Sequence, residues 1–579
     1  MAEEKKTPAV DVVLSTPTSE LAAGEALALG LNPGNNHLQR RLGGKEVQLF
    51  AIGGAVGSGI FLGMGQYLPH GGPAGLFLGF GVWSLVAFCI NECFAEMACY
   101  APVPVCFVEF AKYWVDDALA FAVSWAFFIC QALLVPGEIT GFVILMSFWT
   151  DKIPTAALVM LLIVAYGWVK SLWSWAMDRN LLTETGIGSI INCIDVKWFG
   201  RVEFYLSIGK VFLVFLCFGF TIVTMCGGNP LNDAYGFRYW NNPGAFAEYL
   251  TGGSLGGFWG FLSCMSLATF NICGPEYLSS VAGETVTPRR VLPACYRSFP
   301  FRLLLFFVGS ALCIGIVIPY NDPTLAAYIA GTTKGTAAAS PYVIAMERLK
   351  ISGLPHFVNA VMMTSVFSCG NGVFFAASRA LYVMGKEGRA PAIFGRTTKR
   401  GIPIYATIAC LLISLLALLQ ISSAGSTVLH YFIDLCTVTG LLNYLSACIS
   451  YVHFYHAMKA QGRSRDSLPY KGRFQPYAAY IGIFGTTVMN LVLGFDILVP
   501  FEIKWFFLDY TLIAAFPVAF VVWKYVNKTT YHRLGTGDLG LGGLVKEVDD
   551  YEDLVQPKPE GWMEKIWSGN WQWSSLKKG

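Results

Sequence analysis

Residues 51–61 read AIGGAVGSGIF, an apolar stretch that contains four glycines and one serine. It lies within a longer apolar run, 47–66, whose length suits a helix that crosses the ~30 Å hydrocarbon core of a bilayer. Each glycine destabilises a helix by ~1 kcal/mol relative to alanine. In lipid, the peptide groups freed by a break find no water, so a break persists only beside a cavity or other protein. The stretch therefore predicts a membrane helix that is broken in its middle.

Apolar runs of similar length recur along the rest of the chain. Apolar residues make up 55% of the 579 positions and charged residues only 13%, about half of their usual share in globular proteins. Helices are predicted at 47–66, 74–98, 118–147, 155–170, 203–226, 256–278, 300–320, 355–384, 403–422, 428–456, 477–499 and 504–526. These twelve spans predict an all-α polytopic membrane protein.

A second break is predicted in span 6, where residues 270–276 read FNICGPE. Proline in a helix interior costs ~3 kcal/mol relative to alanine. Interrupted helices at matching positions of two halves indicate a transporter's binding site. The N-termini of half-helices suit a carboxylate, and free carbonyl ends suit an ammonium group, so the pair predicts a zwitterionic ligand.

Each break also has a simpler explanation when it is taken alone. The spacing Gly53-x-x-x-Gly57 is typical of a close helix-packing face. Gly274-Pro275 could produce a mere kink. A dinucleotide-binding turn would need a soluble strand–turn–helix unit, which the sequence lacks. The occurrence of two breaks, five spans apart, favours the binding site.

Lysine and arginine residues collect in alternate loops, which predicts that those loops are cytoplasmic. They are Arg289, Arg290, Arg297, Arg302, Lys386, Arg389, Arg396, Lys399, Arg400, Lys459, Arg463, Arg465, Lys471 and Arg473. The pattern predicts cytoplasmic tails at 1–45 and 527–579 around a membrane domain at 46–526. The first tail has no apolar signal-peptide core. The Trp-rich part of the second, 562–573, predicts either an interfacial helix or a loosely ordered tail.

Among the ionisable residues inside or at the ends of the predicted spans, four stand out: Glu96, Glu138, Lys210 and Glu276. A charge at bilayer depth costs at least ~2.5–3.5 kcal/mol on insertion scales, so such residues are functional candidates. Apolar residues flank Lys210 on both sides, and burial favours the neutral form of a lysine, so Lys210 is a candidate for proton exchange. The alternative is a lysine that snorkels to the cytoplasmic interface. Glu96 and Glu138 have the alternative role of structural hydrogen-bond anchors.

Other classes of site find little support in the sequence. Most of the sixteen cysteines lie in apolar runs, where they behave as small hydrophobic residues, and no Cys/His spacing predicts a metal site. The net charge of +3 is spread over loops and predicts no nucleic-acid partner. His430 and Asp434 match a His-x-x-x-Asp acyl-transfer pattern, but no second motif accompanies it. We therefore expect no enzymatic activity and no bound metal.

The sequence resembles the fungal-type amino acid permeases of the amino acid–polyamine–organocation superfamily, from about His37 to about Lys528. The similarity is carried by HLQRRL at 37–42, AIGGAVGSGIF at 51–61, GGPAG at 71–75, AGE at 282–284, PRR at 288–290, VIPYNDP at 317–323, ASRALY at 377–382 and AQGRSRDSLPY at 460–470. It implies a five-plus-five inverted-repeat core with helices 1 and 6 broken, plus two extra helices, and proton-driven uptake of amino acids.

The resemblance also implies roles for individual residues. The span 1 break would hold the substrate carboxylate and part of the amino group, here through Ala55, Gly57, Ser58 and Gly59. The span 6 break would complete the amino site and gate it with an aromatic ring, here through Phe270, Asn271, Cys273 and Gly274. Lys210 matches the span 5 lysine of proton-coupled members, and Glu138 is the next candidate to carry the proton. Pro275, Glu276 and Glu96 are expected to have gating or structural roles.

The chain departs from the family pattern in three places. Gly274-Pro275-Glu276 stands where many relatives read Gly-Thr-Glu, and Ile272 stands where many have an aromatic residue. The resemblance therefore does not define the side chain of the substrate. The polar, Trp-rich segment 167–190 interrupts the end of span 4. It is either an insertion, such as an unspliced intron in the gene, or an extended cytoplasmic loop.

Together these features predict a proton-coupled amino acid symporter, with no cofactor other than the coupling proton. We expect a multi-pass protein of the plasma membrane whose partners are the substrate, the lipid bilayer and, on its tails, trafficking or ubiquitination machinery. An amino acid sensor on the same fold is one alternative, but the moderate tails favour transport. An ion-coupled chloride cotransporter is the other, and it would usually carry large cytoplasmic domains.

Overall fold

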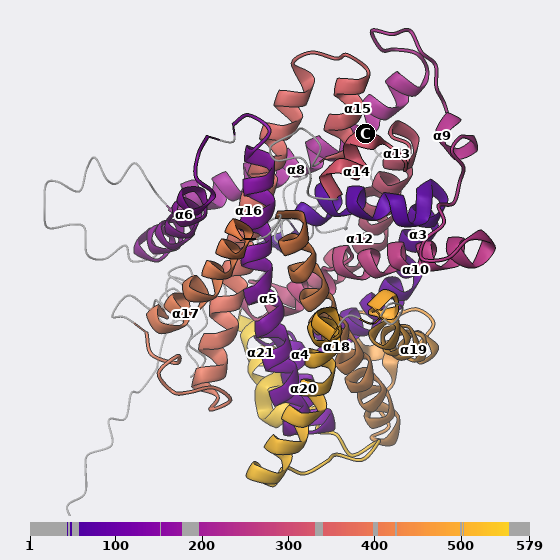
Figure 1. The fold of residues 1–579 in the computed structure, drawn as a ribbon. Coiled ribbons are helices and arrows are strands. Elements are labelled where there is room, and N and C mark those ends of the chain that lie inside the picture. Colours follow the sequence, from indigo (N-terminus) through magenta and orange to yellow (C-terminus); the bar gives the residue numbers. More distant parts are fainter. Residues whose placement is uncertain are drawn as a thin grey trace, which may run out of the picture.

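The computed structural model describes residues 43–44, 47–48, 57–150, 152–176, 196–329, 340–397, 403–422, 425–497, 501 and 503–554. All regular structure in these residues is helical, and no β-strand occurs among them (Figure 1). Ten of the described helical segments are long and apolar enough to cross a membrane. The predicted fold class, an all-α polytopic membrane protein, is confirmed at this level.

The described helices follow one another along the chain with short connections. The first group is η1 (Gly59–Gly63), α3 (Met64–Tyr100), α4 (Cys106–Phe110), η2 (Ala111–Val115), α5 (Asp117–Met146), α6 (Thr155–Ala176), α8 (Val196–Met225), α9 (Arg238–Asn241), α10 (Gly253–Asn271), α11 (Pro275–Ser280) and η4 (Ala282–Glu284). The second is α12 (Pro288–Arg302), η5 (Leu303–Val308), α13 (Gly309–Val317), α14 (Pro323–Ile329), α15 (Pro341–Arg348), α16 (Leu354–Lys386), α17 (Ile404–Ser414), η7 (Leu415–Ile421), α18 (Gly425–Ala460), η8 (Arg465–Ser467), α19 (Tyr477–Val492), η9 (Phe495–Ile497), α20 (Ile503–Asn527), η10 (Leu541–Gly543) and α21 (Leu544–Leu554).

Predicted spans 1 and 2 are joined in the structure. η1 and α3 form one apolar stretch, Gly59–Tyr100, with a single non-helical residue at Gly72. Gly72 has φ 67° and ψ −179°, a conformation that glycine adopts readily and other residues do not. The chain therefore turns at this glycine, without the loop that the sequence predicted between the two spans.

Predicted span 4 corresponds to α6, whose described apolar part, Thr155–Gly167, is shorter than the ten long segments. The predicted insertion at 167–190 lies mostly outside the described residues, because the structure describes no residue from 177 to 195. Almost all of the predicted N-terminal tail and the Trp-rich segment 562–573 also lie outside them.

α5 lies at the centre of the bundle. It packs against α16, α18, α20 and α17, and most of its side chains are buried. α3 packs against α10, α13 and α19. Two large cores result, one around α5 and the end of α3, and one around the start of α3 and α10.

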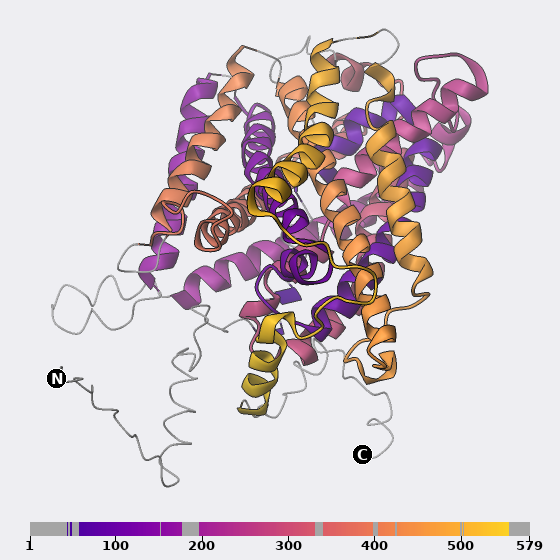
Figure 2. The same ribbon diagram turned by 90° about the horizontal axis from the view of Figure 1, so that it is seen from below.

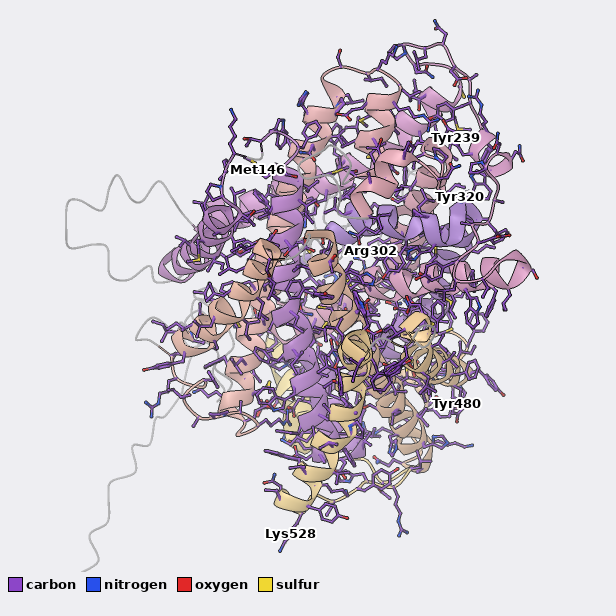
Figure 3. All side chains as sticks on the ribbon, viewed as in Figure 1. Met146, Tyr239, Arg302, Tyr320, Tyr480 and Lys528 are labelled. Carbon is purple, nitrogen blue, oxygen red and sulfur yellow. The ribbon has the colours of Figure 1, made fainter. Side chains whose placement is uncertain are left out.

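The ends of the bundle can be identified from labelled side chains. Met146, Tyr239 and Tyr320 lie in the upper half of the molecule, whereas Lys528 lies at the bottom (Figure 3). Between these ends large apolar side chains point outward, and Leu85 and Phe484 are 69% and 72% exposed. Exposed apolar surface on this scale is typical of contact with lipid.

The chain after α20 turns back onto the bundle. Viewed from below, it leaves α20 and crosses to α21 (Figure 2). We call residues 529–554 the C-terminal strap. It hydrogen-bonds to η2 through His532 N–H, which donates to Val115 O at 2.8 Å. Leu539 and Leu541 of the strap are 1% and 0% exposed. The described part of the predicted C-terminal tail is therefore packed against the membrane domain.

Candidate functional site

The predicted break in span 6 is present. α10 ends at Asn271, α11 begins at Pro275, and the three residues between them are not helical. Gly274 has φ 149°, and a Cβ placed on it would lie 2.8 Å from Cε2 of Phe299. Both the backbone conformation and the lack of space require glycine here. Pro275 is the first residue of α11, where its missing N–H leaves no hydrogen bond unmade.

Glu276 stabilises this break from within. Its Oε2 accepts a hydrogen bond from Gly274 N–H at 3.1 Å and one from the Tyr444 hydroxyl at 2.7 Å. The carboxylate thus lies at the N-terminus of α11, where free N–H groups favour negative charge. Tyr444 also donates to Ile272 O at 3.4 Å. Pro275 and Glu276 therefore have structural roles in the span 6 break.

The residues of the predicted span 1 break are described only from Gly57 onward; Ser58 and Gly59 are helical, and Ala55 lies outside the described residues. A Cβ on Gly57 would overlap the Glu138 carboxylate and lie 2.8 Å from Sγ of Cys369. A Cβ on Gly59 would overlap Oδ1 of Asn271 and lie 3.0 Å from Cε1 of Phe270. These two glycines therefore let the backbone of span 1 approach α5 and the span 6 break closely.

Glu138 of α5 holds the span 1 break. The backbone N–H of Ser58 donates to its two carboxylate oxygens at 3.3 and 3.2 Å, and the Ser58 hydroxyl donates to Oε1 at 3.1 Å. Glu138 is 4% exposed and Ser58 is 2% exposed. The carboxylate of Glu138 thus occupies the hydrogen-bond donors that the sequence assigned to a substrate carboxylate.

Lys210 of α8 is brought to the same region. Its side chain is 1% exposed, and its charge acts on the Glu138 carboxylate. α8 also packs against α16. This burial contradicts the alternative in which Lys210 snorkels to an interface, because a snorkelling side chain carries its charge into water.

A cavity of about 50 Å³ lies where the two breaks meet, and we call it the central cavity. Its lining includes Gly57, Gly59, Glu138, Phe270, Asn271, Cys273, Glu276, Gln131, Cys369 and Tyr444. A water molecule takes about 30 Å³ in the liquid, so the cavity has room for about one or two waters.

Two neutral amides face the central cavity with unused hydrogen-bonding atoms. Oε1 of Gln131 and Nδ2 of Asn271 are buried and make no hydrogen bond among the described residues. The residues are 1% and 4% exposed. A buried polar atom without a partner calls for an explanation, and a bound water, ion or ligand is one. An acceptor and a donor are thus available for a small polar ligand.

The sequence did not single out Gln131, Cys369 or Tyr444. The search there was for ionisable side chains within spans, which finds Glu138 and Lys210 but passes over neutral polar ones. A search for amides inside apolar runs would have found Gln131, which lies between Cys130 and Ala132.

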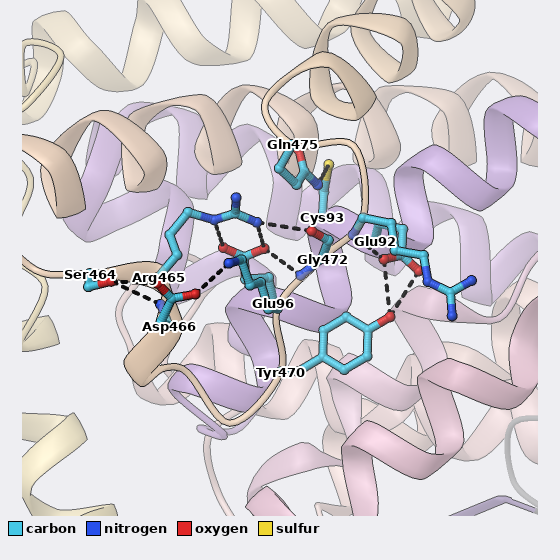
Figure 4. Close-up of polar contacts among 11 residues, drawn as sticks. Glu92, Cys93, Glu96, Ser464, Arg465, Asp466, Tyr470, Gly472 and Gln475 are labelled. Carbon is cyan, nitrogen blue, oxygen red and sulfur yellow. Dashed lines mark hydrogen bonds and ion pairs between the residues drawn. The ribbon is translucent and has the colours of Figure 1, made fainter.

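Glu96 lies away from the central cavity. It accepts hydrogen bonds from Nε and Nη2 of Arg465 at 2.7 and 2.6 Å and from Gly472 N–H at 2.8 Å (Figure 4). The hydrogen bond to Glu96 raises the pKa of Arg465 above its ordinary value. Glu96 thus ties the loop between α18 and α19 to the end of α3, which supports its role as a structural anchor.

The predicted His430–Asp434 pair also comes together, with Nε2 and Oδ2 3.3 Å apart. It lines a different cavity from the one at the breaks. Within the part of the chain that the structure describes, no group of His, Cys, Asp and Glu side chains could hold a metal ion.

The family model for amino acid permeases matches residues 46–534 of the chain. The general amino acid permease AGP2 of Saccharomyces cerevisiae is 37% identical over 523 residues, which cover 89% of this chain and 84% of that protein. The proline-specific permease of Emericella nidulans is 31% identical over 562 residues, covering 95% and 97%. Among solved structures, a manganese transporter from Eremococcus coleocola matches with a TM-score of 0.49. The match covers 90% of this chain and 98% of that one, at 12% sequence identity.

Proposed function

Because the chain belongs to the amino acid permease family, a family of transmembrane amino acid transporters, we propose that it imports an amino acid together with a proton. The observation that supports this most directly is the convergence of the span 6 break, Gly57 and Gly59 of span 1, and Glu138 on the central cavity, with Lys210 acting on Glu138. The relatives named above are permeases, and the sensor and chloride-cotransporter alternatives gain no support from them.

The substrate's two charged groups match the groups around the central cavity. The carboxylate would bind the Ser58 N–H and hydroxyl, which now donate to Glu138. The ammonium would bind carbonyl oxygens of the span 6 break and Oε1 of Gln131, an acceptor that has no partner in the described structure. Nδ2 of Asn271, likewise unpartnered, supplies a further donor for the carboxylate. This division follows the polarity of the half-helix ends.

Coupling follows from competition for the same donors. While Glu138 is ionised, it occupies the N–H and hydroxyl of Ser58. A proton that reaches Glu138, directly or from Lys210, would weaken these charge-assisted hydrogen bonds and release Ser58 to the substrate carboxylate. Proton and substrate would then bind together, which is what symport requires. In this proposal Lys210 takes part through its charge, which acts on the Glu138 carboxylate.

Transport would also require the cavity to enlarge. At about 50 Å³ it holds about one or two waters, so no amino acid fits without a movement of its walls. Phe270 lines the cavity and follows Thr269 near the end of α10. Its ring is therefore well placed to act as a gate, as the resemblance implies.

The remaining features of the proposal concern orientation. The Arg- and Lys-rich loops favour cytoplasmic N- and C-termini. We place the protein in the plasma membrane, where an importer of amino acids would act. The two breaks, five spans apart in the predicted order, support a five-plus-five inverted-repeat core followed by two extra helices. α19 and α20 would be the extra pair.

The test is competitive uptake of labelled amino acids in a permease-deficient host at pH 5 and pH 7.5. We expect accumulation against a gradient that is greater at the lower external pH. Lys210→Ala should lose the dependence on pH and permit at most slow exchange. Lys210→Arg, which keeps its charge at every accessible pH, should stop transport.

Surface abundance of each variant, measured by labelling, serves as the control for folding. If Lys210→Ala still concentrates substrate with the wild-type pH profile, Lys210 is not part of the coupling mechanism. If no amino acid is concentrated by the wild-type protein at either pH, the proposed function itself is wrong.

A further inference from the structure

A second and larger cavity lies beside the central one. Its volume is about 280 Å³, and we call it the outer vestibule. Its walls come from α3, α10, α18, η9 and α20. Ser266 of α10 lines it one turn before Phe270 of the central cavity, and Asp434 of α18 lines it two residues before Cys436 of the central cavity. The two cavities are therefore neighbours along the same two helices.

The vestibule lies toward the side that we assign to the exterior. It lies at the start of α18 and just beyond the end of α19. The Arg- and Lys-rich loop 461–476 joins the other ends of these two helices. Because that loop is expected in the cytoplasm, the vestibule faces the opposite side of the membrane.

The walls of the vestibule carry three carboxylates, Asp434, Asp496 and Asp509. Among the described residues that line it there is no lysine or arginine. Asp434 is paired with the His430 imidazole at 3.3 Å, and Asp496 accepts a hydrogen bond from the Tyr249 hydroxyl at 3.1 Å. Carboxylates gathered in a buried place are costly to ionise, and either a proton or a positive ligand relieves that cost.

Two buried atoms that line the vestibule have unused hydrogen-bonding capacity, and one of them does not belong to the carboxylates. Oδ1 of Asp509 and Oγ of Ser266 make no hydrogen bond among the described residues. The two residues are 3% and 8% exposed, and both line the vestibule. The serine belongs to a different helix from the three acids, so its unused hydroxyl is a separate sign that a polar group belongs in this space.

The arrangement suits an organic cation better than a metal ion. No set of His, Cys, Asp and Glu side chains in the described structure is compact enough to hold a metal. An ammonium group has three donors to share among separate carboxylates, and a guanidinium has five. Aromatic rings line the same cavity. The ring centroids of Trp505 and His430 are 5.3 Å apart in an edge-on arrangement, and those of Tyr249 and His70 are 4.2 Å apart in a stack. Such rings attract a desolvated cation.

We propose that the outer vestibule binds a small organic cation, whose ammonium or guanidinium group lies between Asp434, Asp496 and Asp509. The hydroxyl of Ser266 accepts a hydrogen bond from the same group. This site is separate from the central cavity, and the proposal rests on the proposed function only for which side of the membrane it faces.

The test is direct binding of 1,5-diaminopentane to the purified full chain in lipid nanodiscs. This probe has ammonium groups and no carboxylate, so it does not need the donors of the span 1 break. Asp509→Asn keeps the shape of the side chain and removes its charge, and we expect it to weaken binding by about tenfold or more. Ser266→Ala should weaken binding several-fold. L-Norleucine, which lacks a side-chain cation, should not compete for the vestibule.

Two variants serve as controls. Asp233→Asn removes a carboxylate that is paired with Arg238 on an exposed loop, and it should bind the diamine as the wild type does. Gly59→Leu fills the central cavity, and it should also retain diamine binding. If amino acid uptake fails while the diamine still binds, only the proposed transport function is wrong.

The proposal is overturned if Asp509→Asn and Ser266→Ala bind the diamine like the wild type while both remain monodisperse with unchanged melting temperatures. Loss of diamine binding in Gly59→Leu would place the cation in the central cavity instead. Binding of Zn²⁺ or Mn²⁺ that Asp509→Asn abolishes, without diamine binding, would show a metal site and would equally overturn it.

Discussion

At the scale of single residues, the two glycines of the span 1 break are defined by what lies against them. A Cβ on Gly59 would overlap Oδ1 of Asn271, and a Cβ on Gly57 would overlap the Glu138 carboxylate. These contacts join span 1 to the span 6 break and to α5. The side chains that any substitution would displace are therefore the same ones that line the central cavity.

Gly59→Ala should lower the maximal rate of amino acid uptake by about tenfold or more, since an added methyl in a packed site costs about 1–3 kcal/mol. Gly81→Ala is the matched control, because a Cβ there meets nothing within 4 Å. Uptake of a labelled amino acid, divided by surface abundance, checks both variants. Normal uptake by Gly59→Ala would show that this glycine does not shape the substrate site.

The sequence could identify these residues only in part. The glycines and Glu138 were found because their types are unusual inside apolar spans, and Asn271 was found through the family resemblance. That Glu138 accepts hydrogen bonds from Ser58 could not be inferred, since the two residues are 80 positions apart and no local pattern links them. The roles of Gln131 and Tyr444 depend on the same long-range packing. Types of residue were predictable here, and their partners were not.

At the scale of elements, some helix ends could be predicted from the sequence and others could not. The end of α10 and the start of α11 were predictable from Gly274-Pro275, since both residues oppose a continuous helix. The continuity of α3 through Gly71-Gly72-Pro73 was not, because it depends on the backbone conformation of Gly72. A Gly-Gly-Pro sequence is equally typical of a loop, and only packing against α10 decides between the two.

A polar cluster at the end of α16 gives a prediction at this scale. Oε2 of Glu387 lies 2.7 Å from Nη1 of Arg389, whose side chain also reaches Asp117 of α5 at 3.4 Å. Partial desolvation raises the pKa of Glu387 to about 7, although its side chain remains 32% exposed. Its folded-state pKa is thus above its unfolded value, so the folded protein binds a proton that the unfolded chain releases. This carboxyl group therefore makes the fold less stable as the pH rises from about 5 through 7.

Glu387→Gln removes this titration. The melting temperature of wild type relative to Glu387→Gln should fall as the pH is raised from 5 to 8, measured by thermal unfolding in detergent. Asp233→Asn serves as the control, because the hydrogen bond from Arg238 lowers the pKa of Asp233 and its titration lies below this range. A difference between wild type and Glu387→Gln that stays constant from pH 5 to 8 would contradict the raised pKa.

At the scale of the whole molecule, the class of protein was the most predictable property. Apolar composition, the recurrence of long apolar runs and the positions of lysine and arginine depend on the bilayer rather than on tertiary contacts. The polar segments were the least predictable. The chain after 527 was expected to be a cytoplasmic tail, yet its described part, the C-terminal strap, packs against the ends of several helices.

The strap joins parts of the molecule that are distant in sequence. Trp114 of η2 donates through Nε1 to Asp538 O at 3.0 Å, and the Tyr100 hydroxyl donates to Leu539 O at 3.1 Å. Arg289 of α12 lies 2.5 Å from Asp549. α3, η2 and α12 are thereby connected at one end of the bundle. In a transporter whose helices move against one another, such a connection should stabilise the arrangement in which it forms.

Leu541→Ala tests this connection, because Leu541 is 0% exposed and truncation of a buried leucine costs about 2–5 kcal/mol. We expect the melting temperature of the purified protein to fall by about 5 °C or more. Leu534→Ala is the matched control on the same segment, since Leu534 is 53% exposed, and it should leave the melting temperature nearly unchanged. Equal melting temperatures for the two variants would show that the strap does not hold these helices together. A lower melting temperature for Leu541→Ala alone would instead show that the strap is part of the folded membrane domain.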